Sequence, residues 1–148
     1  MNAHSPYIRF KTSRIENEWL AWQELLHPAL YVLVLSAALW LYRKTGKRTV
    51  ITDLLRTEAE ERAIYPNEPD KRSVHQYGRG ADLKTNGVPP DVIKEWVDWI
   101  NEAWRYYGSS GLLTALYHEV GGGGLHLHIQ IGPLELKPEQ PKNYIMEA

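Results

Sequence analysis

The chain has 148 residues, of which 43% are hydrophobic and 24% charged, values typical of a single globular domain with its own hydrophobic core. The formal net charge of -1 gives no electrostatic basis for binding nucleic acid or an acidic membrane surface. The absence of cysteine excludes disulfides and thiolate metal sites, so any metal ion must be held by His, Asp or Glu. We therefore expect one domain, with an N-terminal arm at residues 1–11, a core at about 12–132 and an extended tail at 133–148.

The N-terminal third of the chain is predicted to be helical. Ser13 can cap a helix, because Glu16 follows three residues later. Pro28 suits the first turn of a second helix, which Gly46 would end. The apolar run of that helix, residues 29–42, is shorter than the roughly 20 residues that span a bilayer, so we expect a buried helix and no integral membrane segment.

Strands and one more helix are predicted in the rest of the chain. Residues 48–56 have the composition of a strand, and the polar residues 57–72 are expected to form a long surface loop. Residues 89–104 have apolar side chains at the spacing of an amphipathic helix. Two strand-like runs, 112–120 and 125–131, flank a run of glycines and predict an antiparallel hairpin. This order of elements predicts an α+β domain with helices packed on a small antiparallel sheet.

Two groups of possible metal ligands stand out. His75 and Asp82 would face opposite sides of a continuous strand, so they can meet only if the backbone turns at the two glycines between them. The stretch His126-Leu127-His128 places two imidazoles on one strand face, roughly 6.5 to 7 Å apart. A catalytic zinc ion takes three protein ligands and one open position. His75, Asp82 and one histidine of the later pair would supply that set.

Three segments resemble a known group of enzymes. Residues 73–82, SVHQYGRGAD, resemble the Ser-x-His-x-x-Gly-x-Ala-x-Asp motif of the zinc peptidases grouped with D-alanyl-D-alanine carboxypeptidases, phage endolysin peptidases and the hedgehog signalling domain. Residues 126–128, HLH, resemble the His-x-His motif of the wider group that includes lysostaphin and murein endopeptidases. Residues 50–57, VITDLLRT, resemble the strand ending in arginine upstream of the first motif. The resemblance covers about residues 48–131 and implies a fold like that of the hedgehog domain and the D-alanyl-D-alanine peptidases.

The resemblance also implies roles for individual residues. It makes His75, Asp82 and His128 the ligands of one zinc ion, which is the expected cofactor. It gives His126 an assisting role in catalysis. Arg56 gains a role with the substrate or the transition state, since a guanidinium can hold a substrate carboxylate by a bidentate contact.

One departure from the motif leaves the general base open. The carboxypeptidase branch has a catalytic acid three positions before its last zinc histidine, and Leu125 occupies that position here. The nearest acid, Glu119, lies across the glycine run, so the base is either His126 or Glu119, and we favour His126. Two more residues are candidates for contact with substrate: Tyr77, beside the first motif, and His118, which either borders the cleft or faces solvent.

The function implied by the resemblance is zinc-dependent hydrolysis of an amide bond in peptidoglycan stem or cross-link peptides, by a carboxypeptidase or endopeptidase such as a phage or prophage lysis enzyme. Residues 1–10 lack the apolar core of a signal peptide, so the expected location is the cytoplasm, with release to the cell wall by a holin-type route. The alternative is a non-catalytic zinc-bearing binding or structural protein, such as a phage tail component or pseudoenzyme, which the missing acid at position 125 favours.

Overall fold

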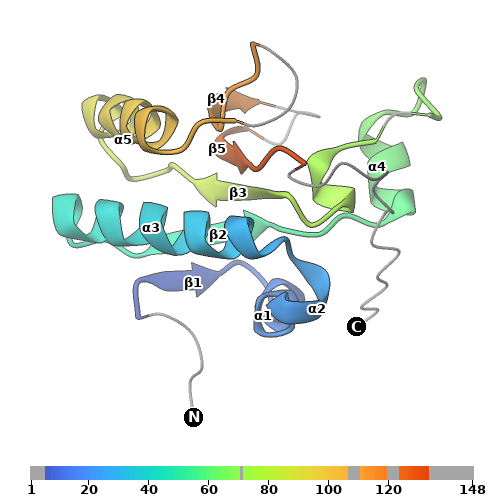
Figure 1. The fold of residues 1–148 in the computed structure, drawn as a ribbon, viewed down its shortest axis with the longest axis horizontal. Coiled ribbons are helices and arrows are strands. Elements are labelled where there is room, and N and C mark those ends of the chain that lie inside the picture. Colours follow the sequence, from blue (N-terminus) through green and yellow to red (C-terminus); the bar gives the residue numbers. More distant parts are fainter. Residues whose placement is uncertain (1–5, 71, 107–110, 120–123, 134–148) are drawn as a thin grey trace.

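The computed structural model describes residues 6–70, 72–106, 111–119 and 124–133, except for the side chain of Glu119. Within these residues the chain forms one sheet in the order β1-β2-β3-β5-β4, flanked by helices (Figure 1). The strands are β1 (Ile8–Phe10), β2 (Thr49–Asp53), β3 (Gly80–Lys84), β4 (Ala115–Glu119) and β5 (Leu125–Gln130). The helices are α1 (Ser13–Leu20), α2 (Trp22–Leu25), α3 (Pro28–Thr45), α4 (Glu58–Ile64) and α5 (Pro90–Ala103), with a 3-10 helix η1 (Val74–Gln76). The predicted α+β class is confirmed.

The ends of the first long helices follow from local sequence signals. Thr12, one residue before the predicted cap, accepts a hydrogen bond from the Ile15 amide at 3.2 Å and begins α1. Pro28 lies in the first turn of α3, and Gly46 ends that helix in the left-handed conformation, with φ 74°. No helix among the described residues has the length and apolar character needed to cross a membrane.

Two segments differ from the prediction. Residues 8–10, expected in an arm, form β1, which runs parallel to β2 and makes the sheet mixed rather than antiparallel. Ile8 is 4% exposed, because this pairing places it in the core. Residues 57–72, expected to form a loop, contain α4, which begins with a capping box in which Thr57 and Glu60 each bind the other's backbone amide.

The predicted hairpin is confirmed. β4 and β5 pair antiparallel, with His118 opposite His126. β3 lies between β2 and β5 and is antiparallel to both. Most of the glycine run, residues 121–123, and the predicted tail from residue 134 onward lie outside the described residues.

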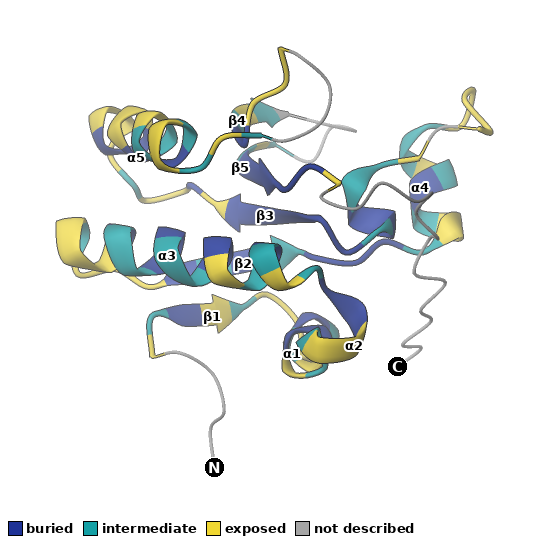
Figure 2. Cartoon of the chain, in the orientation of Figure 1, coloured by how far each residue is buried: buried dark blue, intermediate teal, exposed yellow. Residues whose placement is uncertain are grey.

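The sheet has one apolar face and one polar face. On the apolar face the fully buried side chains of Ile51, Leu83 and Leu127 belong to the core on which α3 and α5 pack. Figure 2 shows buried residues along the central strands β3 and β5. Because side chains alternate along a strand, Asp82 and His128 point to the opposite face. The helices α3 and α5 thus support the strands from one side, and polar side chains gather on the other.

We expect Trp96→Ala to lower the free energy of unfolding by about 3–5 kcal/mol, because it leaves a cavity between two helices. Trp96 is fully buried, and its indole Nε1 donates to the Ala37 carbonyl oxygen at 3.0 Å, which joins α5 to α3. The control is Leu112→Ala, at a side chain 47% exposed, with an expected change within about 0.5 kcal/mol. Urea denaturation followed by circular dichroism measures both variants, and equal losses would contradict the described core.

Candidate metal centre

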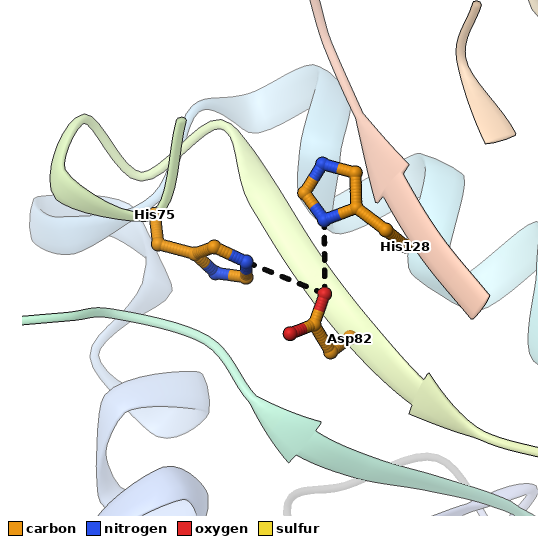
Figure 3. A group of neighbouring side chains, drawn as sticks. All are labelled: His75, Asp82 and His128. Carbon is orange, nitrogen blue, oxygen red and sulfur yellow. Dashed lines mark hydrogen bonds and ion pairs between the residues drawn. The ribbon is translucent and has the colours of Figure 1, made fainter. Parts of the chain in front are cut away.

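Three buried side chains from different elements meet on the polar face of the sheet (Figure 3). His75 comes from η1, and Asp82 and His128 lie directly opposite each other on β3 and β5. Asp82 Oδ1 is 2.9 Å from His128 Nδ1 and 3.3 Å from His75 Nε2. One ligand atom of each residue lies within 4.8 Å of the other two, so the group could hold a metal ion. The structure brings together the three residues predicted as ligands.

A tight turn between η1 and β3 joins the first two ligands. Gly78 has φ 68°, and a Cβ there would lie 2.2 Å from the Leu25 carbonyl oxygen. A Cβ at Gly80 would lie 2.4 Å from Val74 Cγ2. The predicted turn at the two glycines is therefore confirmed, and each glycine is needed for a separate steric reason.

The hydrogen-bond partner of His75 orients its ring toward the site. His75 Nδ1 lies 2.9 Å from the Leu54 carbonyl oxygen, which can only accept a hydrogen bond. We therefore assign the hydrogen of the neutral ring to Nδ1, which leaves the lone pair of Nε2 directed at Asp82. Metal-binding histidines are commonly oriented by such a contact on the second nitrogen.

Gln130 orients His128 in the same way. Gln130 Nε2 donates to the Leu113 carbonyl oxygen at 2.8 Å, so its Oε1 faces His128 Nε2 at 3.0 Å as an acceptor. The hydrogen of neutral His128 then belongs on Nε2, and the lone pair of Nδ1 faces Asp82. Gln130 is absent from the predicted site, although its place two positions after His128, on the same strand face, is a signal for it.

In their neutral forms, two imidazoles direct lone pairs at one carboxylate oxygen, and a proton or a metal ion relieves this repulsion. Burial opposes a charge on His75, but the attraction of Asp82 and Asp53 outweighs burial and raises the pKa of His75 to about 9. Burial also opposes the charge of Asp82, but the attraction of His75 outweighs burial and holds the pKa of Asp82 well below its usual range. The carboxylate is therefore charged at neutral pH and suited to a cation.

Two further histidines lie beside the three ligands. His126 Nε2 is 3.5 Å from Asp82 Oδ2, and its Nδ1 is 3.1 Å from the Gly124 carbonyl oxygen, so the Nε2 lone pair also faces the carboxylate. The ring centre of His118 lies 5.1 Å from that of His126 and 5.3 Å from that of His128. Burial and the neighbouring His128 lower the pKa of His118, which favours its neutral form. His118 is thus half-buried beside His126 and His128, but it does not line the cleft described below.

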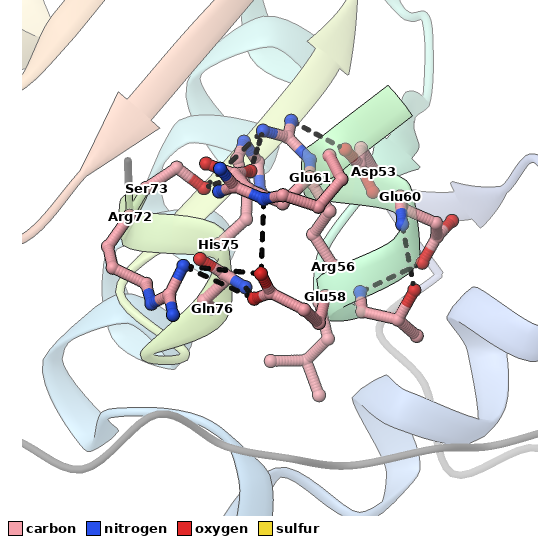
Figure 4. Close-up of polar contacts among 12 residues, drawn as sticks. Asp53, Arg56, Glu58, Glu60, Glu61, Arg72, Ser73, His75 and Gln76 are labelled. Atoms are coloured by element: carbon pink, nitrogen blue, oxygen red, sulfur yellow. Dashed lines mark hydrogen bonds and ion pairs between the residues drawn. The ribbon is translucent and has the colours of Figure 1, made fainter. Parts of the chain in front are cut away.

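Arg56 is buried near the site in a network of its own (Figure 4). Its Nη1 donates to Glu61 Oε1 at 2.9 Å and its Nη2 to Asp53 Oδ2 at 3.0 Å. Ser73 Oγ donates to the same Glu61 oxygen at 3.0 Å. Burial lowers the pKa of Arg56, but the two carboxylates outweigh it and raise the pKa. Both terminal nitrogens of the guanidinium are thus engaged within the protein, and a substrate carboxylate would compete with Glu61 and Asp53 for them.

A cleft of about 700 Å³ opens beside the ligands. Its walls include Asp82, His126 and Arg56, so a molecule in the cleft would lie against the metal centre. Leu125, at the position of the missing acid, also lines the cleft and is 58% exposed.

The remaining predicted residues do not line this cleft. Tyr77 and His118 are absent from its walls. Tyr77 lies instead beneath the guanidinium of Arg79, whose central carbon is 5.7 Å from the ring centre. Glu119 ends β4 opposite Leu125, but its side chain lies outside what the structure describes.

Metal binding is expected to stabilise the protein. A divalent ion at 100 times its dissociation constant should add about 2.7 kcal/mol to the free energy of unfolding. Asp82→Asn should abolish this gain, because it removes the charge that both imidazoles share. The control Asp98→Asn, at an exposed acid paired with Lys94 on α5, should retain the gain. Thermal denaturation with and without the ion measures the difference, and a full gain in Asp82→Asn would contradict the site.

The pKa of His75 should make metal affinity depend on pH. In the metal-free protein His75 keeps a proton up to about pH 9, above the ordinary value of 6.5, and a metal ion must displace that proton. Affinity should therefore rise as the pH increases from 6.5 to about 9. Calorimetric titrations in buffers of different ionisation enthalpy at about pH 7.5 should detect the release of about one proton per ion. Binding without proton release would show that His75 is already neutral in the metal-free protein, which would contradict the raised pKa.

Comparison with known proteins found no relative of this chain. No family model matches the chain, and no curated protein or solved structure matches it. The function is therefore argued from the geometry of the site and from the motifs in the sequence.

Proposed function

We propose that the protein is a zinc-dependent peptidase that hydrolyses an amide bond in the stem or cross-link peptides of peptidoglycan. The main support is the convergence of His75 Nε2, Asp82 Oδ1 and His128 Nδ1 on one point at the edge of a cleft. Imidazole and carboxylate ligands suit zinc, and catalytic zinc sites have three protein ligands and an open fourth position. The absence of cysteine fits a site built from these ligand types alone.

The proposed reaction assigns His126 as the general base. Bound zinc would polarise the scissile carbonyl and acidify a water molecule. His126 would accept the proton of the attacking water at Nε2, because its Nδ1 is held by the Gly124 carbonyl oxygen and its Nε2 faces the ligands. It would then donate that proton to the nitrogen of the leaving amine as the amide bond breaks. His126 stands outside the group of three ligands, which leaves it free for this role.

Arg56 and His118 have supporting roles in this proposal. The guanidinium of Arg56, fixed by Asp53 and Glu61, places a positive charge at the cleft wall, where it would stabilise the negative charge that develops on the scissile carbonyl. His118 would position the ring of His126, which it contacts from the neighbouring strand.

The substrate class comes from the sequence. Residues 73–82 and 126–128 resemble motifs of enzymes that cut cell-wall peptides. In this proposal the protein acts at the cell wall, as a phage or prophage lysis enzyme released by a holin-type route would do.

A zinc-bearing protein without catalytic activity, such as a phage tail component or pseudoenzyme, is the second candidate. The observation in its favour is Leu125, an exposed apolar side chain at the position where the carboxypeptidase branch has its acid. The two candidates differ in what they require of His126, since a binding protein needs only the three ligands.

Mass spectrometry of purified peptidoglycan after incubation with zinc-loaded or chelated protein tests the proposal. We expect new peptide fragments only with zinc. His126→Ala should retain zinc but lower the rate by about 100- to 10,000-fold, because it removes the general base. Asp82→Asn should lose both zinc and hydrolysis. Zinc bound in full, with no cleavage of any cell-wall chemotype, would instead support the binding protein.

A further inference from the structure

The acidic side chains of the cleft are already paired within the protein. Asp53 binds Arg56 at 3.0 Å, and Glu60 binds Arg14 at 2.7 Å. Asp82 lies against the histidines of the metal centre. Asp53 and Glu60 are therefore balanced by arginines, and Asp82 would be balanced by a bound metal ion.

Three basic side chains of the same cleft have no acidic partner among the described residues. Arg9, Lys11 and Lys84 line the cleft, and no ion pair in the described part of the chain involves any of them. The cleft thus has an excess of positive charge, although the formal net charge of the whole chain is -1. Unbalanced charge of one sign in a cleft attracts ligands of the opposite sign.

Of these three basic residues, the strand register places Lys84 beside the proposed catalytic residues. It lies directly opposite His126 in the pairing of β3 with β5. Asp82 lies two positions before it on the same face of β3, a spacing of roughly 7 Å. Arg9, on β1, is two strands away from β3, which corresponds to about 10 Å.

We propose that Lys84 binds the terminal carboxylate of the peptide, on the residue released by cleavage, so that the protein is a carboxypeptidase. This inference rests on the proposed function. The carboxylate of a C-terminal residue is three bonds from the scissile carbonyl carbon, within about 4 Å of it. A scissile carbonyl bound at the metal centre therefore places this carboxylate within reach of the Lys84 ammonium, because lysine carries its charge at the end of a long, flexible side chain.

Lys84 suits this role better than Arg56. The terminal nitrogens of Arg56 are engaged by Glu61 and Asp53, whereas the ammonium of Lys84 has no ion-pair partner within the part of the chain that the structure describes. A charge-assisted contact of this kind distinguishes a free terminal acid from a peptide that continues beyond the cleaved bond. Arg9 and Lys11, farther along the cleft, attract the anionic peptide at a distance, and salt weakens their contribution.

Two acetylated peptides that end in D-Ala-D-Ala, one a free acid and one a C-terminal amide, test the inference. With zinc-loaded protein we expect kcat/KM for the acid to exceed that for the amide by about 10- to 100-fold, the range of a contact with a charged group. Lys84→Met should bring this ratio close to 1 by slowing hydrolysis of the acid alone. The matched control is Lys94→Met, on the exposed surface of α5, which should keep the full ratio.

The outcomes separate this inference from the proposed function. An unchanged ratio in Lys84→Met, or a wild-type protein without preference for the acid, overturns the role of Lys84 while the peptidase stands. If neither peptide is hydrolysed, the peptidoglycan digest decides the proposed function, and equilibrium binding of the same peptides to the zinc-loaded proteins decides the inference. Tighter binding of the acid that Lys84→Met loses supports it, and equal binding of acid and amide overturns it.

Discussion

The carboxylate of Asp82 faces the lone pairs of three imidazoles, and a hydrogen-bond acceptor behind each ring directs that lone pair. A neutral imidazole has one ring hydrogen, so the group behind it decides which nitrogen is free. The Leu54 and Gly124 carbonyl oxygens and the side chain of Gln130 serve as those acceptors. The ligand set is therefore defined by the orientation of the rings as well as by their identity. A proton on one ring, or a metal ion between the rings and the carboxylate, relieves the repulsion among these lone pairs.

The Leu54 carbonyl must itself be held in place, and buried charges around the end of β2 do so. The Leu55 amide donates to Glu18 Oε1 at 3.1 Å, and Arg14 binds Glu18 and the Leu55 carbonyl oxygen. The next residue, Arg56, is fixed by α4. Buried ion pairs add little net stability, because desolvation offsets their attraction. Their effect here is geometric, since they fix the backbone that orients the first ligand.

The parts of the fold that the sequence predicts are those with local signals. α3 extends between a proline suited to its first turn and a glycine suited to its end, and the hairpin has two apolar runs around glycines. Ile8–Phe10 has no such signal, because three residues cannot establish a period and their strand state depends on pairing with β2. Thr57 and Glu60 did form a recognisable capping box, but the polar composition of the segment favoured a loop.

The residues of the candidate site likewise differ in whether a local sequence signal predicts them. His75, Asp82 and His128 are predictable because their spacing, with glycines for the turn, matches a motif that has a chemical reason. Gln130 could have been found from the alternation of side chains along β5. The ion pair of Arg56 could not have been predicted, because its partner Glu61 lies on α4, in a segment that was expected to be a loop.

The position of the candidate metal ligands within the sheet has a consequence for motion. Asp82 and His128 lie on β3 and β5, each of which has a hydrogen-bonded strand on both sides, so their amides are released only when the core itself opens. Arg9 lies on the three-residue strand β1 at the margin of the sheet, which can separate from β2 at a smaller cost in free energy. The cleft therefore has a rigid end at the candidate metal site and a more adaptable end at β1, so a ligand could shift the β1 end without displacing Asp82 or His128.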